Sequence, residues 1–192
     1  MNNNKNRKKE IINACIRLIN EKGLDLSSMQ DIANKVGISK STLYFYFDSK
    51  ESLYREVFLH CHRMDCQACN EGIDELDHAL DKLCKRFENI INYAISHPQE
   101  AQVEAFYQVS PVYGKESELI KSDFIRDIVG IMEEGIEKKQ IKNMSEWILA
   151  EFYYGIAYSM YMKFKNEPEL WDDEFIRKSC FEMIKDTFSY KK

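Results

Sequence analysis

One glycine that separates two short amphipathic segments constrains the fold of this chain more than any other feature. The first segment begins at Ser27 or Ser28, and Ser27 and Gln30 have the spacing of a helix capping box. Its apolar residues recur at the spacing of one helix face: Met29, Ile32, Ala33 and Val36. Gly37 is expected to end this helix, and Ser39 to cap the next one. Helix, short glycine-containing turn and helix are typical of a helix-turn-helix unit.

The rest of the chain is also predicted to be helical. Only 7 Gly and 3 Pro occur among 192 residues, which argues against an all-β fold because such folds need frequent turn residues. Besides the helix from Ser27 or Ser28, amphipathic helices are expected over residues 5–22, 40–47, 50–71, 75–96, 99–109, 117–139, 146–164 and 172–190. We therefore expect an all-α protein of about nine helices. A three-helix head would occupy residues 1–50, and a helical body residues 51–192.

Charge is distributed unevenly between the two ends of the chain. The net charge is −5, but residues 1–55 hold 10 Lys and Arg against 6 Asp and Glu, whereas residues 56–192 hold 17 against 26. A basic segment on an acidic body favours a binding role for the N-terminal part, although ordinary solvated surfaces also have such charges.

Hydropathy and cysteine content bear on the cellular location. No apolar run approaches the ~18 residues that a membrane-spanning helix requires. The polar, basic N-terminus is not followed by an apolar segment of the signal-peptide type. We therefore expect a cytoplasmic protein with no membrane partner, in which the six cysteines are reduced thiols.

The helix expected over residues 40–47 has one apolar and one polar face. At 100° per residue, Leu43 and Phe47 fall on the side that would pack on the preceding helices. The opposite side and its flanks carry a cation, hydroxyl groups and aromatic rings: Lys40, Ser41, Thr42, Tyr44, Phe45 and Tyr46. Such side chains suit the DNA major groove, where cations and hydroxyls reach phosphates or base edges and rings contact thymine methyl groups. The alternative is a small surface helix with ordinary exposed aromatics.

The stretch LSSMQDIANKVGISKSTLYFYFDSKESLY resembles the DNA-binding region of TetR-family transcriptional repressors. The pieces that carry this resemblance are Asp31–Ala33, Val36–Phe47 and Ser49–Leu53, and it covers about fifty residues at the N-terminus. It implies an all-α fold with a helix-turn-helix head and a helical body that binds an effector and forms a homodimer. The implied function is a transcriptional regulator, most often a repressor, that a small molecule releases from its operator.

The resemblance also implies which residues contact double-stranded DNA: Ser28, Gln30, Lys40, Ser41, Thr42, Tyr44, Phe45, Tyr46 and Lys50. Gln30 can pair with adenine through two hydrogen bonds, and Lys50 matches the phosphate-contacting lysine of the family. The basic residues from Lys5 to Lys9 could add backbone contacts. Phe45 stands where the family often has a more polar residue, so it either reads bases or packs.

The last two long helices are expected to pair two copies of the chain. Residues 146–164 carry too many large apolar groups for a single buried stripe, and residues 172–190 carry an apolar stripe of their own. A helix that is apolar on more than one side must be buried on more than one side. A twofold homodimer satisfies this and predicts an inverted-repeat operator; the alternative is a purely intramolecular core.

The middle of the chain is expected to hold a partly apolar effector pocket. Candidate lining residues are aromatic or branched: Phe87, Ile91, Phe106, Tyr107, Phe124, Ile128, Tyr154 and Tyr158. For each of them taken alone, a place in the ordinary core is the more common role. An effector that prefers one conformation of the body would lower operator affinity by shifting the population of conformations.

A cluster of histidine and cysteine supports a second hypothesis. His62, Cys66 and Cys69 lie at i, i+4 and i+7 of one predicted helix, a spacing that could bind a metal ion or, at Cys66 and Cys69, sense an oxidant. Ordinary packing is the alternative, and we expect no metal and no cofactor.

A third hypothesis is an all-α enzyme or interaction module. The chain contains no nucleophile elbow, no glycine-rich phosphate loop and no HExxH pair. We therefore predict that the protein is not an enzyme.

Overall fold

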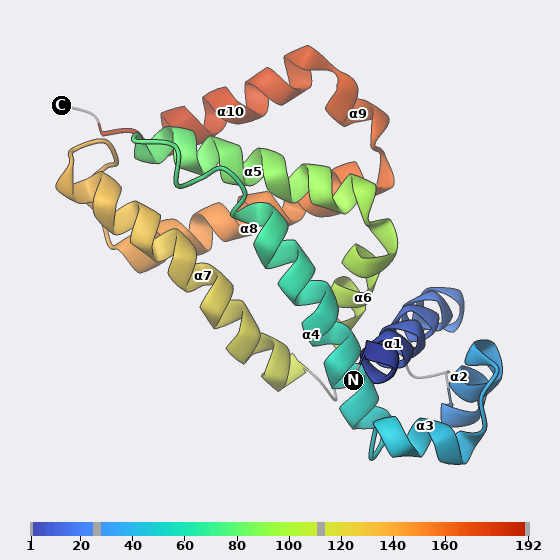
Figure 1. Ribbon diagram of the computed structural model, residues 1–192. Coiled ribbons are helices and arrows are strands. Elements are labelled where there is room, and N and C mark those ends of the chain that lie inside the picture. The colour runs from blue at the N-terminus through green and yellow to red at the C-terminus, as the bar shows by residue number, and fades with distance from the viewer. Residues whose placement is uncertain (1, 25–27, 111–113, 191–192) are drawn as a thin grey trace. The chain divides into compact units, whose positions relative to one another are not determined.

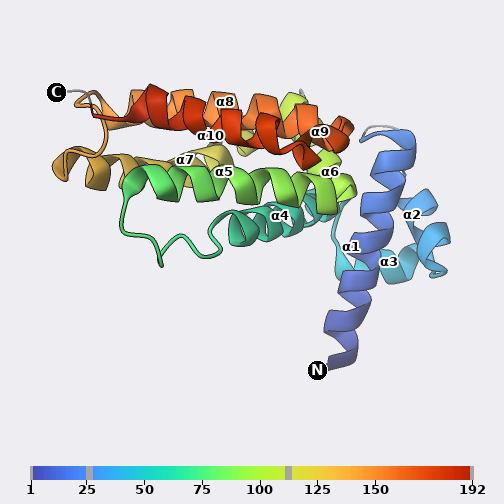
Figure 2. The ribbon, with the colours of Figure 1, turned by 90° about the horizontal axis from the view of Figure 1, so that it is seen from above.

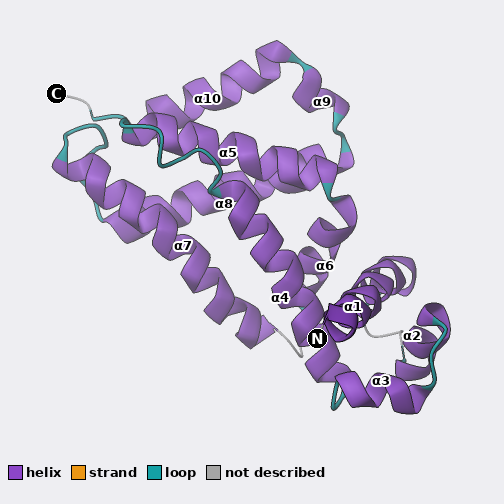
Figure 3. Cartoon of the chain, in the orientation of Figure 1, coloured by secondary structure: helices purple, strands orange, loops and turns teal. Residues whose placement is uncertain are grey.

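The computed structural model describes residues 2–24, 28–110 and 114–190, with side chains except at 2, 3, 5, 108, 109 and 114–124. These residues form helices, loops and one isolated antiparallel bridge between Ile141 and Ser189 (Figure 3). The helices are α1 (Asn2–Lys22), α2 (Met29–Val36), α3 (Lys40–Tyr46), α4 (Lys50–Cys69), α5 (Ala79–Ser96), α6 (Pro98–Val109), α7 (Gly114–Glu137), α8 (Glu146–Asn166), α9 (Glu169–Asp172) and α10 (Glu174–Phe188). The prediction of an all-α fold is confirmed.

Glycines end the first two helices as the sequence predicts. Gly23 and Gly37 adopt φ angles of 85° and 74°, a left-handed conformation that other residues rarely adopt. Gly37 and Ile38 donate backbone hydrogen bonds to Asn34 O and Ala33 O, which closes the last turn of α2. This closure sets the short turn between α2 and α3.

Three details of the helices differ from the predictions. The capping box of α2 joins Ser28 and Asp31, not Ser27 and Gln30: the Ser28 hydroxyl accepts from Asp31 N, and the Asp31 carboxylate accepts from Ser28 N. Helix α5 begins at Ala79, later than predicted, because His78 caps it. The connection before α10 contains the short helix α9, in a stretch that the sequence predicts to be a linker.

The chain divides into two compact units. Unit 1 comprises residues 1–64 and 99–117, and unit 2 comprises residues 65–98 and 118–192. These units and the predicted domains are different divisions of the chain, so the predicted boundary at residue 50 stays a prediction. None of the described helices is long and apolar enough to cross a membrane.

In unit 1, α2 packs against α1 and α3 (Figure 1). The apolar stripe of α1 is buried, as are the inward residues of the next three helices: Ile11, Cys15, Ile19, Met29, Ile32, Leu43, Leu53 and Val57. On α6, Tyr107 stacks on Phe58 of α4, with ring centroids 4.0 Å apart.

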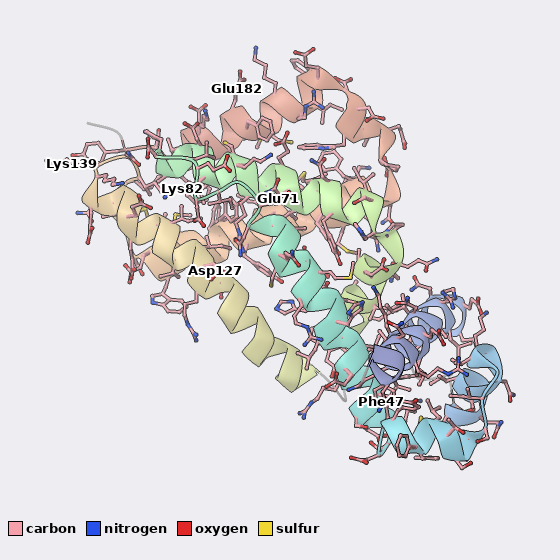
Figure 4. All side chains as sticks on the ribbon, in the orientation of Figure 1. Phe47, Glu71, Lys82, Asp127, Lys139 and Glu182 are labelled. Carbon is pink, nitrogen blue, oxygen red and sulfur yellow. The ribbon has the colours of Figure 1, made fainter. Side chains whose placement is uncertain are left out.

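In unit 2, α5 packs against α8 and α10 (Figure 2). Side-chain hydrogen bonds join α5 to α8 and to α9, because the Tyr153 hydroxyl of α8 donates to Leu83 O at 2.8 Å and the Trp171 indole of α9 donates to Asn92 Oδ1 at 2.9 Å. Lys82 of α5 forms an ion pair with Glu134 of α7 at 2.6 Å (Lys82 is labelled in Figure 4).

Candidate nucleic-acid interface

Two buried side chains and one cap hold α3 on the head. Leu43 is 0% exposed and Phe47 is 3% exposed, so the apolar face of α3 is covered as the sequence predicts. The Ser39 hydroxyl accepts a hydrogen bond from Thr42 N at 3.0 Å, which satisfies a backbone donor at the start of the helix. The opposite face of α3 is thereby fixed as an outward surface.

The outward face carries the predicted side chains. Lys40, Ser41, Thr42 and Tyr44 are exposed, Phe45 is 77% exposed, and Tyr46 is half-buried. The Lys40 ammonium lies 5.9 Å from the centre of the Tyr44 ring. The rings of Phe45 and Tyr46 meet edge to face, with centroids 5.3 Å apart and planes at 89°. Cation and ring contacts of this kind orient long side chains on a short helix.

The hydroxyl groups of this face are partly engaged within the head. Ser39 Oγ lies 2.8 Å from Ser41 Oγ and 2.7 Å from Thr42 Oγ1, at hydrogen-bonding distance. The Ser28 hydroxyl donates to Asp31 Oδ2 at 2.6 Å and caps α2. These bonds hold the hydroxyls in place, and a DNA contact by any of them must share or replace a bond that already exists.

Gln30 and Lys50 flank α3 along the sequence. Gln30 is exposed on α2 and donates to Asn34 Oδ1 at 2.9 Å. The Lys50 ammonium, at the start of α4, lies 5.1 Å from the centre of the Tyr54 ring. Hydrogen bonds from Ser28 and Lys22 hold the pKa of Asp31 below its usual range, so this carboxylate stays ionised beside the capped end of α2.

A groove of about 540 Å³ lies beside this face and is lined by Asn4, Arg7, Glu10, Phe45 and Tyr46. Arg7 and Glu10 form an ion pair at 2.6 Å on the surface of α1. The sequence points to Arg7 only as part of a basic arm and does not single out Asn4 or Glu10. The periodicity of α1 does contain a signal, because these three polar residues recur at i and i+3 on one side of that helix.

The predicted effector residues lie in both units. Phe87, Ile91 and Ile128 are buried, and Tyr154 and Tyr158 are half-buried on α8 with stacked rings 6.0 Å apart. In unit 1, Phe106 is half-buried and Tyr107 is buried. The side chain of Phe124 lies outside the described residues. Whether these residues bind an effector stays a prediction.

An apolar groove of about 490 Å³ lies on unit 2. Its walls come mainly from α8 and α10: Phe87, Glu151, Phe152, Gly155, Ile156, Ser159, Met160, Cys180, Met183, Ile184 and Thr187. Phe152 is 60% exposed and Met183 is 69% exposed, so large apolar side chains of both helices face solvent in one chain. This surface lies on the two helices that the sequence predicts to form a dimer.

The predicted metal candidates do not form a cluster. Within the described part of the chain, no group of three His, Cys, Asp or Glu residues is arranged to hold a metal ion. Cys69 is fully buried and its thiol donates to Asp65 Oδ1 at 3.1 Å. Burial raises the pKa of Cys69 well above its usual value and so disfavours the reactive thiolate. His62 lies with its Nδ1 3.9 Å from Glu104 Oε2.

Glu104, on α6, is a buried acid that the sequence does not single out. Its side chain is 8% exposed, and Oε1 has no hydrogen-bond partner among the residues the structure describes. Burial raises the pKa of Glu104 to about 8, which favours the neutral form at pH 7. Nothing in the local sequence distinguishes Glu104 from the half-buried Glu100 one turn earlier, because its burial depends on the packing of α6.

Comparisons with known proteins support this description of the head and of the fold. Residues 11–57 match the family described as bacterial regulatory proteins, tetR family. The chain is 24% identical over 185 residues to the biofilm operon icaADBC negative transcriptional regulator IcaR of Staphylococcus aureus, covering 89% of this chain and 100% of that protein.

Two solved structures share the fold at low sequence identity. The regulator FadR of Bacillus subtilis, in complex with stearoyl-CoA, is 21% identical with a TM-score of 0.80, covering 92% of this chain and 96% of that one. AibR, in complex with isovaleryl coenzyme A and operator DNA, is 17% identical with a TM-score of 0.73, covering 92% and 97%. The helix-turn-helix head of this chain matches the TetR family of transcriptional regulators, and the solved structures share its all-α fold.

Proposed function

We propose that this regulator is a repressor that binds an inverted-repeat operator as a homodimer and is released by a small-molecule effector. One observation carries the DNA-binding part: α3 buries Leu43 and Phe47 while its other face exposes Lys40, Tyr44 and Phe45. The S. aureus relative is a negative transcriptional regulator, which supports repression. The operator DNA bound to AibR supports the same role for the head.

The outward residues divide into two kinds of DNA contact. Lys40 and Lys50 supply positive charge to phosphates, which positions the protein and makes binding depend on salt. Gln30, Tyr44 and Phe45 face outward with groups that suit base edges. Further hydroxyl groups can reach the DNA backbone or the bases where their hydrogen bonds within the head allow: those of Ser28, Ser41, Thr42 and Tyr46.

The homodimer is proposed to form through α8 and α10. The apolar groove of these helices exposes Phe152 and Met183, and a second copy of the same surface would cover them. A twofold dimer of this kind presents two α3 helices to successive major grooves, about 34–36 Å apart, which matches an inverted-repeat operator.

The effector is proposed to be at least partly apolar. The candidate lining residues are aromatic or branched, and FadR holds stearoyl-CoA, a ligand with a long acyl chain. An effector that prefers a conformation with weak operator affinity would shift the population of conformations away from the DNA-bound one.

Regulation of an operator requires a protein in the cytoplasm. The alternative signal at Cys66 and Cys69 has little support, because burial keeps the Cys69 thiol protonated.

The experiment is a gel-shift titration with duplexes that the wild-type protein selects from a random library. The double variant Tyr44→Ala with Lys50→Ala is expected to lose specific binding while sedimentation still reports a dimer. Unchanged binding by this variant would show that α3 does not recognise the DNA sequence.

Replacing Cys66 and Cys69 with serine is expected to leave effector release unchanged. A lost response to zinc or peroxide would favour the thiol hypothesis instead.

A further inference from the structure

Phe45 is an exposed aromatic residue on the outward face of α3. It is 77% exposed, whereas Leu43, two residues earlier, is fully buried. The edge of one ring contacts the face of the other between Phe45 and Tyr46, and this contact limits the directions that the Phe45 ring can take. Tyr44, one residue earlier, is also exposed, and clustered exposed rings on one helix face indicate a partner surface.

The chemistry of Phe45 restricts what it can recognise. Its ring has no hydrogen-bond donor or acceptor, so it cannot read the polar pattern of base edges. In the major groove the one apolar group on a base edge is the C5 methyl of thymine. Ser41 precedes Phe45 by one helical turn, and its hydroxyl lies 2.8 Å from Ser39 Oγ. Because the Ser41 side chain is small, the Phe45 ring is the larger of the two side chains on this side of the helix.

We propose that Phe45 selects a thymine in each operator half-site by contact with its C5 methyl group. The proposal rests on the proposed function, because it requires that α3 enters the major groove. It resolves the two roles open to Phe45 from sequence: the side chain reads a base instead of packing within the head. The neighbouring groove, lined by Asn4 and Arg7 as well as Phe45, leaves the ring accessible to a duplex.

The test removes single methyl groups from the DNA. A duplex selected from a random library by the full-length protein is resynthesised with each thymine replaced in turn by deoxyuridine, which pairs identically but lacks the methyl group. Dissociation constants are measured by fluorescence anisotropy for the wild type, Phe45→Ala and Lys50→Ala. The last variant is the control, because it weakens binding through a phosphate contact and should keep the sensitivity to the methyl group.

One thymine in each half-site is expected to respond. Wild type should lose about fourfold in affinity for one missing methyl group and about fifteenfold for both, as expected for one buried carbon on each side. Phe45→Ala should bind the selected duplex and the deoxyuridine duplexes with equal affinity. Lys50→Ala should lose affinity for the deoxyuridine duplexes by the same factors as the wild type. The proposal is overturned if no thymine responds in the wild type, or if Phe45→Ala responds as the wild type does. Failure of the proposed function has another result: no sequence is enriched from the library at all.

Discussion

Leu43 and Phe45 are separated by one residue on α3 and have opposite surroundings, because Leu43 is 0% exposed and Phe45 is 77% exposed. Leu43 packs into the head and fixes the helix, whereas Phe45 extends from it. The two residues therefore separate the stability of the head from its binding function, since each can be changed alone.

Truncation of these two residues should affect stability very differently. Leu43→Ala removes buried methyl groups and leaves a cavity, so it should lower the free energy of unfolding by about 2–5 kcal/mol. Phe45→Ala should change it by no more than about 0.5 kcal/mol, because the ring is largely in solvent. Urea unfolding followed by circular dichroism measures both. Equal losses would mean that the assignment of the two faces is wrong.

The capping box of α2 gives a second prediction. Ser28→Ala removes the acceptor of the Asp31 N hydrogen bond and should lower the free energy of unfolding by about 1 kcal/mol. Ser41→Ala is the control, because its hydroxyl contacts another side chain and caps no helix. A loss for Ser41→Ala as large as that for Ser28→Ala would contradict the assigned cap.

The same cap should weaken in acid. Hydrogen bonds hold the pKa of Asp31 below its ordinary value of 3.8, so its stabilising contribution is present above that pH and is lost as the pH falls below it. Asp31→Asn should therefore make the stability of the head less dependent on pH in this range. Melting temperatures at pH 2–5 test this, because the loss is expected below pH 3.8, and parallel curves for both proteins would count against an ionised Asp31 in the cap.

Glu104 should give the opposite dependence on pH. Its pKa is about 8 in the folded chain against an ordinary 4.5, so between these values the folded state keeps a proton that the unfolded state has released. Stability from this group is full below pH 4.5, falls by up to about 1.4 kcal/mol per pH unit as the pH rises, and stops falling above about pH 8. Glu104→Gln should remove that slope.

The control for Glu104 is Glu137→Gln, which changes an exposed carboxylate of α7. Denaturant unfolding at one-unit intervals from pH 5 to 9 should give parallel curves for this control and the wild type. A slope that persists in Glu104→Gln would assign the pH dependence to another group, such as the nearby His62.

The exposed apolar surface of α8 and α10 gives a prediction about assembly. Phe152→Glu would place a charge among the apolar side chains of the proposed dimer interface, and should convert the dimer to a monomer because burying that charge is costly. Met144→Glu is the control, because Met144 is 50% exposed but lies outside the groove. Analytical ultracentrifugation measures both, and a dimer that survives Phe152→Glu would place the interface elsewhere.

The head could be predicted from sequence because its determinants are local. Gly23 and Gly37 end helices through their own backbone conformation, Ser39 caps α3 from the adjacent position, and the spacing of Leu43 and Phe47 assigns the buried face. Local sequence does not decide between Ser27 and Ser28 as the cap of α2, because each stands three residues before a polar side chain. The structure makes Ser28 the cap.

The body could be predicted only as a set of helices. Which face of a helix is buried depends on the neighbours it receives, and these are distant in sequence. Phe87 shows this, because its ring lies 6.0 Å from that of Trp171 in α9, a helix that the sequence pattern does not predict. The burial of Glu104 and of the Cys69 thiol likewise follows from packing that no local pattern encodes.

The central claim is that the outward face of α3 recognises a particular DNA sequence. The most direct measurement is the ratio of dissociation constants of the wild-type protein for a selected duplex and for a scrambled duplex of equal length, at one salt concentration of about 150 mM. The account predicts at least about a thousandfold tighter binding to the selected duplex. Equal affinity for the two duplexes would contradict it.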